Sequence, residues 1–134
     1  MAKESGIGMT LQVDDSGGTL RALTTDATAV NFATPRTMQD ITGLNSSAVE
    51  RLLLLADFSI TMTAVFNDAV NTMHDVFKTI PSTSVTRTVT IAISGQTLTN
   101  EAILTDYPLT RAASGELTTS VPGTLNSTVV PTWA

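Results

Sequence analysis

Several residue types that carry chemistry are scarce or missing in this sequence. It has no cysteine, one histidine, one tyrosine and one tryptophan, and aromatic residues make up 4% of its 134 residues. Without cysteine, a disulfide framework, a thiolate nucleophile and a cysteine-ligated metal are excluded. A single histidine leaves too few imidazoles for a typical zinc site. The sequence therefore indicates no metal ligand set and no cofactor.

Charge is also scarce, and its balance is acidic. Charged residues make up 14% of the chain, and the net charge is −5 at pH 7. The seven basic residues are scattered, whereas tight binding of phosphate backbones needs clusters of Lys and Arg that release counterions. Tight binding of nucleic acid is therefore not expected.

Long apolar runs are absent as well. The longest strongly apolar run, residues 52–56, is far below the ~20 residues that a helix needs to cross a bilayer. Residues 1–6 show no apolar stretch behind their charge, unlike a signal peptide. We expect no membrane-spanning segment and a protein that folds in a cytoplasm.

β-branched residues are abundant. The chain has 25 threonines, 11 valines and 7 isoleucines, side chains that are stiff at χ1 and suit a pleated surface. Its 42% hydrophobic residues are enough for one core, and no linker divides the chain. The composition predicts a single domain over residues 1–134 with a mainly β fold.

Alternation of apolar and polar residues predicts about seven strands. The ranges are 9–14, 19–23, 29–33, 58–66, 85–93, 97–107 and 115–121. Asp15 to Gly18 supply turn residues between the first two strands, which predicts a hairpin. In the clearest strand, the alternate residues from Phe58 to Phe66 are expected to face the core.

One helix is expected after that strand. Asn67 or Asp68 is a suitable N-cap, and Pro81 marks the end. Apolar residues recur at three- and four-residue spacing in between: Ala69, Val70, Met73, Val76, Phe77 and Ile80. His74 and Asp75 are neighbours on this helix and point about 100° apart, so they do not form an acid/base pair. We assign no catalytic residue.

Two segments lie outside this regular pattern. Residues of about 1–8 form a polar tail that we expect to be flexible, and a long loop is expected over about 35–52, with strand-like composition at 38–42. Loops of this length are usually functional or disordered. Trp133 lies at the end of the chain, where a large apolar ring needs cover. It either closes its own barrel, with Val129 and Val130 as a last strand, or anchors on a neighbour; we favour the first.

Three stretches together resemble the major tail, or tail tube, proteins of long-tailed bacteriophages, especially those of actinobacterial hosts. The first comprises residues 14–24 and 38–44, with the Asp40-Ile41-Thr42 segment. The second comprises residues 50–51 and 56–68, together with the helix around His74. The third runs from 104–107 through Arg111 and 115–118 to the end at 130–133.

The resemblance implies a structural protein and not an enzyme. Its fold would be an antiparallel β-sandwich or barrel with one flanking α-helix, and its subunits would form hexameric rings that stack into a tube. Its partners would be tail tip or baseplate, tape measure and tail terminator proteins, and DNA would pass through the lumen without sequence recognition. The subunit would assemble in the host cytoplasm and reside in the virion, in the phage tail.

The long loop and the terminal segments would bridge neighbouring subunits or successive rings. The residues expected at these interfaces are Asp40, Ile41, Leu44, Asn45, Ser46, Val49, Glu50, Arg51, Leu53 and Trp133. Leu52 to Leu55, at the end of the loop, would be costly to leave exposed.

Other functions stay open at this point. The chain is alternatively another phage assembly subunit, such as a capsid decoration or tail terminator protein, or the related tube subunit of a type VI secretion system. A third alternative is a β-sandwich module that binds a carbohydrate or a host receptor, although such modules usually present aromatic side chains. An enzyme is the least supported alternative, because no catalytic constellation is evident.

Overall fold

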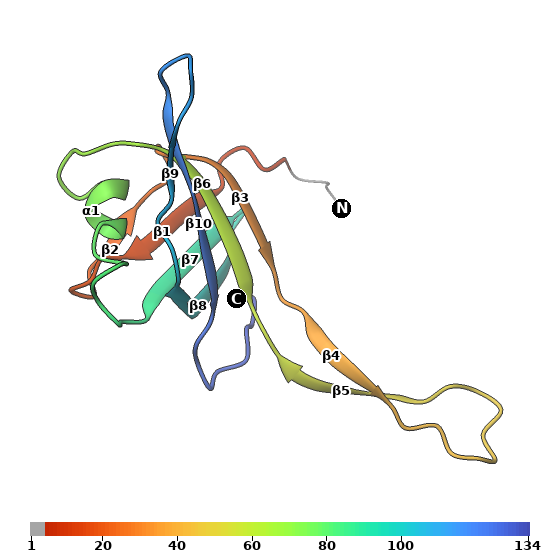
Figure 1. Cartoon of the computed structure of the whole chain (residues 1–134). Coiled ribbons are helices and arrows are strands. Elements are labelled where there is room, and N and C mark those ends of the chain that lie inside the picture. The colour runs from red at the N-terminus through yellow and green to blue at the C-terminus, as the bar shows by residue number, and fades with distance from the viewer. Residues whose placement is uncertain (1–4) are drawn as a thin grey trace.

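The structure, a computed structural model, describes residues 5–134, which form ten strands and one short helix (Figure 1). The strands are β1 (Thr10–Asp14), β2 (Leu20–Ala22), β3 (Ala27–Ala33), β4 (Arg36–Asp40), β5 (Arg51–Ala56), β6 (Ser59–Val65), β7 (Arg87–Ile93), β8 (Gln96–Leu104), β9 (Leu109–Arg111) and β10 (Leu117–Leu125). The helix, α1 (Met73–Phe77), follows β6. The expected mainly β fold with one flanking helix is confirmed.

Eight of these strands form one antiparallel sheet. Its order is β2-β1-β7-β8-β10-β6-β3, and β9 pairs with β10 beside this path. Ser94 and Gly95 join β7 to β8 and both have positive φ, 49° and 79°, the conformation that closes a two-residue hairpin. β4 and β5 form a separate two-stranded sheet.

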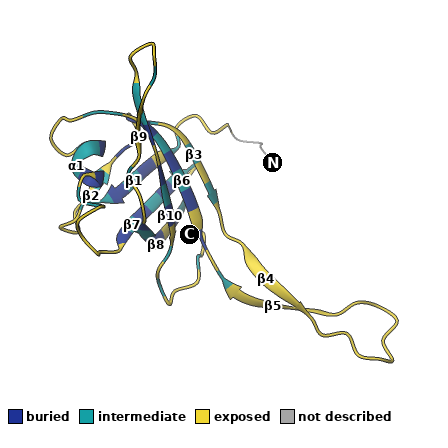
Figure 2. Cartoon of the chain, in the orientation of Figure 1, coloured by how far each residue is buried: buried dark blue, intermediate teal, exposed yellow. Residues whose placement is uncertain are grey.

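The large sheet bends so that the inward sides of its two halves share one core (Figure 2). The buried hydrophobic residues are Leu11, Val13, Leu23, Phe58, Ile60, Met62, Ala64, Met73, Val76, Phe77, Val89, Ile91, Leu98, Ala102, Leu104 and Val121. β6 supplies the alternate residues Ile60, Met62 and Ala64, and Phe58 precedes them. The predicted core face of this strand is confirmed except at its end, where Phe66 is only partly buried against the core.

The predicted helix is wrong in its extent. It was expected from Asn67 or Asp68 to Ile80, but α1 is only five residues long, and its N-cap, Thr72, makes no side-chain capping hydrogen bond. Asn67 instead accepts a hydrogen bond from the Ala69 amide at 3.1 Å. Asn71 has φ 64°, and this left-handed residue interrupts any helix that would begin before it.

Two strand predictions also differ from the structure. The strand expected over 97–107 ends at Leu104, and the short β9 was not expected. β10 continues to Leu125 instead of ending near 121, despite Pro122. The Pro122 carbonyl accepts a hydrogen bond from the Thr105 amide, just beyond the end of β8. The nitrogen of Pro122, which has no hydrogen, faces the same side of β10. On that side, β9 pairs with residues 117–119 and β8 with residues 123–125, so Pro122 lies between the two pairings. Proline is tolerated there because no ladder bond is lost.

Gly123 permits close packing beside this proline. A Cβ at this position would lie 2.7 Å from a Leu104 methyl carbon and 3.1 Å from an Ile60 methyl carbon. No larger residue fits without displacing these core side chains.

The inward side of β7 holds an unexpected charge. Val89 and Ile91 are buried as predicted, whereas Val85 lies outside the strand and is exposed. Arg87 takes the next core position and is 1% exposed. Its guanidinium donates to the Val76 carbonyl, to the Asp14 carbonyl and to the Thr79 hydroxyl. Burial lowers the pKa of Arg87.

Candidate assembly interface

β4 and β5 project from the body as an arm, defined here as residues 36–56 (Figure 1). The arm continues the β3–β6 hairpin. Ala33 pairs with Ser59, the Asp57 amide donates to the Pro35 carbonyl at 2.9 Å, and Arg36 then pairs with Ala56. Within the long loop expected over about 35–52, the strand-like stretch at 38–42 overlaps β4, whereas β5 was not expected, and the irregular part is limited to residues 41–50.

Local hydrogen bonds close the tip of the arm. The Ile41 amide donates to the Glu50 carbonyl at 3.0 Å, and the Glu50 amide donates to the Thr42 hydroxyl at 2.9 Å. The Thr42 hydroxyl donates to the Asp40 carboxylate at 2.6 Å. This hydroxyl and the Thr42 amide lower the pKa of Asp40. Asp40 thus stabilises the turn at the tip of its own arm through Thr42. It forms no ion pair with Arg51, its cross-strand neighbour.

A β-bulge bends the root of the arm. The register shifts between Arg36 and Met38, so that Leu54 and Leu55 lie opposite Thr37. The Arg36 guanidinium donates to the Leu54 carbonyl from Nε at 3.2 Å and from Nη2 at 2.8 Å. Bulges redirect side chains and increase local twist. Leu55, which lies at this bulge, is 86% exposed.

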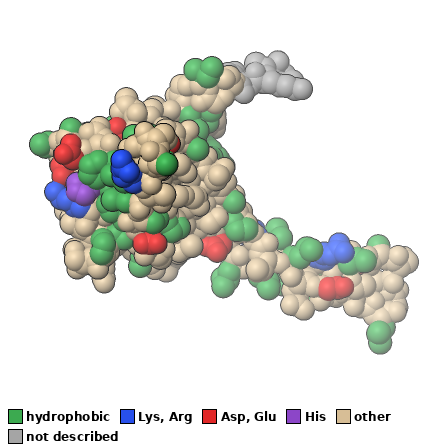
Figure 3. Space-filling view, turned by 45° about the horizontal axis from the view of Figure 1, so that its top comes forward, with side chains coloured by type: hydrophobic (Ala, Val, Ile, Leu, Met, Phe, Trp, Pro, Cys, Tyr) green, Lys and Arg blue, Asp and Glu red, His purple; other side chains and the backbone are tan. Residues whose placement is uncertain are grey.

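Many hydrophobic side chains are exposed along the arm, among polar side chains and a few charged ones (Figure 3). Every residue from 33 to 55 is exposed. Eight of the exposed residues are large and hydrophobic: Met38, Ile41, Leu44, Val49, Leu52, Leu53, Leu54 and Leu55. Successive strand residues point to opposite faces, so the four consecutive leucines make both faces of the ribbon apolar. Contiguous exposed apolar surface of this kind marks interaction sites.

Nine of the ten residues expected at interfaces lie on the arm. Asp40 ends β4, Arg51 and Leu53 belong to β5, and the other six occupy the connecting loop: Ile41, Leu44, Asn45, Ser46, Val49 and Glu50. The structure places these nine together because the loop is carried on a two-stranded ribbon. Their role as contacts between subunits stays a prediction.

Trp133 lies apart from the arm. It forms an isolated antiparallel bridge with Leu98, and the neighbouring Ala134 and Thr97 exchange hydrogen bonds of 2.8 and 2.9 Å. Its ring lies 6.1 Å from that of Phe32 on β3. Trp133 thus contacts its own sheet, although its side chain is still 45% exposed.

The last strand expected at Val129 and Val130 is not formed. Both residues are exposed, and neither belongs to a strand. Pro131 follows them and cannot donate to a ladder, so pairing resumes only at Trp133.

A groove lies between the root of the arm and this C-terminal segment. Its volume is about 290 Å³, and it is lined by Leu55, Ala56, Leu125 and residues 127–130. None of the lining residues is charged. No local sequence pattern indicates this groove, because its two sides are about 70 positions apart in the chain.

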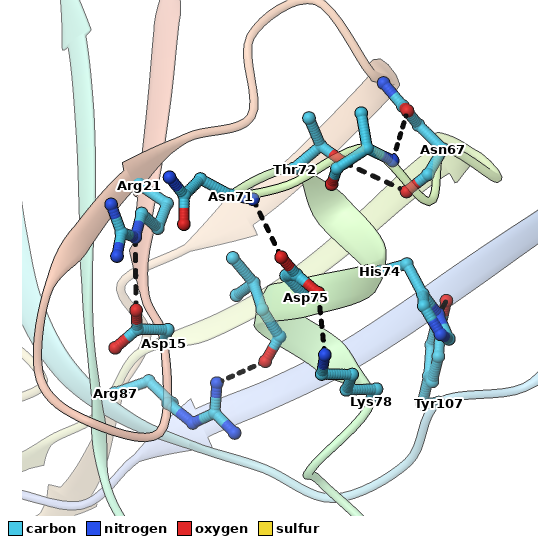
Figure 4. Close-up of polar contacts among 12 residues, drawn as sticks. Asp15, Arg21, Asn67, Asn71, Thr72, His74, Asp75, Lys78, Arg87 and Tyr107 are labelled. Atoms are coloured by element: carbon cyan, nitrogen blue, oxygen red, sulfur yellow. Dashed lines mark hydrogen bonds and ion pairs between the residues drawn. The ribbon is translucent and has the colours of Figure 1, made fainter.

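His74 and Asp75 diverge in space and make separate contacts (Figure 4). His74 Nδ1 lies 3.0 Å from the Tyr107 hydroxyl, and the imidazole packs against the ring of Phe66 in a tilted arrangement, with 4.9 Å between the ring centroids. Asp75 binds Lys78 at 2.7 Å and the amide of Asn71 at 2.8 Å. These contacts give both residues a structural role.

The described part of the chain has neither a metal-binding cluster nor a helix that could span a membrane. Within residues 5–134, no group of three or more His, Asp and Glu side chains is arranged to hold a metal ion. In the same range, no helix is long and apolar enough to span a membrane.

The similarity of this chain to known proteins lies in its structure. No protein-family model and no curated protein sequence matches the chain. A chain in the virion of a native gene transfer agent particle is similar, with a TM-score of 0.77 and 16% identity over 97% of this chain and 99% of that one. A chain in the tail of an empty gene transfer agent particle with C6 symmetry is also similar, with a TM-score of 0.75 and 17% identity over 98% of each chain. The chain therefore has the same fold as a protein of a six-fold symmetric tail.

Proposed function

We propose that this protein is the structural subunit of a phage-like tail tube. Six copies form a ring, and rings stack into a hollow conduit through which a genome is delivered. The observation that carries the proposal is the exposed apolar arm on a fold shared with a chain of a C6-symmetric tail.

The arm needs partners on two sides. A two-stranded ribbon is at best marginally stable by itself in water, and here both faces carry exposed leucines, because Leu52 and Leu53 are consecutive residues in regular register and point to opposite faces. A single flat partner would cover one face only. Neighbours within a ring and in the next ring supply two such surfaces, which supports a stacked assembly.

The charge of the chain suits a conduit for DNA. An acidic wall repels phosphates and limits adhesion during passage, and the net charge of the chain is −5. The few basic residues are also dispersed along the sequence, which disfavours a strip of positive charge that would hold the DNA.

The same proposal gives the location and the other partners. The subunit assembles in the cytoplasm of a host, which we propose to be an actinobacterium, and it resides in the virion. Tail tip or baseplate, tape measure and tail terminator proteins meet the tube at its ends or in its lumen. The chain itself performs no catalysis and needs no cofactor.

Negative-stain electron microscopy of the purified protein over a range of concentrations tests this function. Stacked six-fold rings or hollow tubes are the expected result. Tube subunits that need an initiator complex are detected by repeating the imaging with tail tip proteins present. Monomers under both conditions, or isolated rings that never stack, would contradict the proposal and favour a binding module or a tail terminator, respectively.

A further inference from the structure

The groove at the root of the arm is open and lined with apolar side chains that water still reaches. Leu55, Val129 and Val130 line it and are 86%, 71% and 59% exposed. By contrast, the pocket between β1 and β3 includes Leu11, which is buried in the core of the same chain. Exposed apolar side chains around a concavity favour an occupant that covers them.

The tip of the arm has matching chemistry. Residues 41–49 carry no charge, and Ile41, Leu44 and Val49 are exposed. Leu44 is the most exposed of the three and is completely accessible to water. The groove is also free of charged residues. Docking of one surface on the other therefore buries apolar area without removing any charge from water.

The tip and the groove lie at opposite ends of the same arm. The strands β4 and β5 separate them and carry the tip away from the body (Figure 1). At about 3.3 Å per residue, the five residues of β4 alone span more than 10 Å. The tip is therefore held away from the groove of its own chain, and a complementary tip must come from another copy.

We propose that the groove receives the arm tip of a second copy of this chain, with Leu44 between Leu55 and the Val129–Val130 segment. This proposal rests on the proposed tube function and identifies the surface on which the arm docks. Donor and acceptor are different surfaces of one chain, so the contact is heterologous and continues from copy to copy. The acceptor includes the root of its own arm, so each docked tip also packs against the base of the next arm.

Disulfide trapping tests the docking directly, because the natural chain has no cysteine to interfere. One chain carries Leu44→Cys and a second carries Val129→Cys, and equal amounts are assembled and mildly oxidised. Docking brings the two Cα atoms within the ~4.4–6.8 Å that a disulfide spans. The expected result is a covalent heterodimer on a non-reducing gel in the mixture, with either chain alone remaining monomeric. Val130→Cys provides a second acceptor variant.

Val70→Cys is the matched control acceptor. Val70 is 79% exposed and lies beside α1, away from the groove. Tubes in which neither acceptor variant cross-links to Leu44→Cys would overturn the docking proposal and leave the tube function standing. Cross-linking to Val70→Cys in place of the acceptor variants would also overturn it. If the unmodified protein forms no tubes, even with tail tip proteins, both proposals fail together.

Discussion

The Asp26 carboxylate accepts a hydrogen bond from the main-chain amide of Met73, 47 positions along the chain, at 3.2 Å. Its other oxygen accepts from the side-chain amide of Asn67 at 2.9 Å. Asp26 is 8% exposed. One buried carboxylate therefore fixes both the turn before α1 and the first residue of this helix.

Replacing Asp26 by Asn should destabilise the fold. The new amide group would face a donor, and leaving a buried hydrogen-bonding group unsatisfied costs about 1–3 kcal/mol. Urea denaturation should show a loss of this size in the free energy of unfolding. The matched control is Asp68→Asn at an exposed position, expected to change this free energy by less than about 0.5 kcal/mol. Equal effects of the two substitutions would contradict the anchoring role of Asp26.

Arg87→Ala should lower the free energy of unfolding by about 2–3 kcal/mol. The substitution removes hydrogen bonds from a charged donor to Val76, Asp14 and Thr79, and bonds to charged groups are worth about 1.5–3 kcal/mol. The control is Arg21→Ala, which breaks a partly exposed ion pair with Asp15 worth about 0–1 kcal/mol. The denaturant midpoints of the two variants measure this difference. If Arg87→Ala lowers the free energy of unfolding no more than Arg21→Ala does, the role of Arg87 in joining α1 to β1 is contradicted.

Phe58→Ala and Phe77→Ala should each destabilise the protein by about 3–5 kcal/mol. Both rings are completely buried, so each truncation leaves a cavity in the core. Phe66→Ala serves as the comparison. Phe66 is only partly buried, so its truncation should lower the free energy of unfolding by a smaller amount. Thermal or denaturant unfolding measures all three, and an unchanged midpoint for Phe58→Ala would be incompatible with the packing described above.

Deleting residues 46–50 should leave a folded body that does not form tubes. The hydrogen bonds of the deleted residues stay within the arm, from Ser46 to Gly43 and between Glu50 and Ile41 or Thr42, so the core should be unaffected. Circular dichroism should show an unchanged β-rich spectrum, and electron microscopy should show monomers.

The point variant Leu53→Asp complements this deletion. It places a charge on an exposed face of the arm, so stability should change by less than about 0.5 kcal/mol while tube formation is lost. Normal tubes from either variant would refute the role of the arm in assembly.

The class of fold and most of the strands follow from local patterns in the sequence. Alternation from Phe58 to Ala64 specified a buried face because side chains of a strand point alternately to its two sides. The same local rule identified Val89 and Ile91 as core residues. It also indicated that the segment after Pro35 is exceptional, without revealing that two strands carry it outward as an arm.

Features that depend on distant partners arise only in the folded chain. α1 begins at Met73 because Asp26 binds its amide and Asn71 interrupts any earlier turn. Arg87 is buried because carbonyls and a hydroxyl from other elements satisfy its guanidinium. The groove exists only where the arm meets the C-terminal segment. Spacing along a chain reports which side of an element a residue faces, but hydrogen bonds and cavities between remote segments form only when folding brings those segments together.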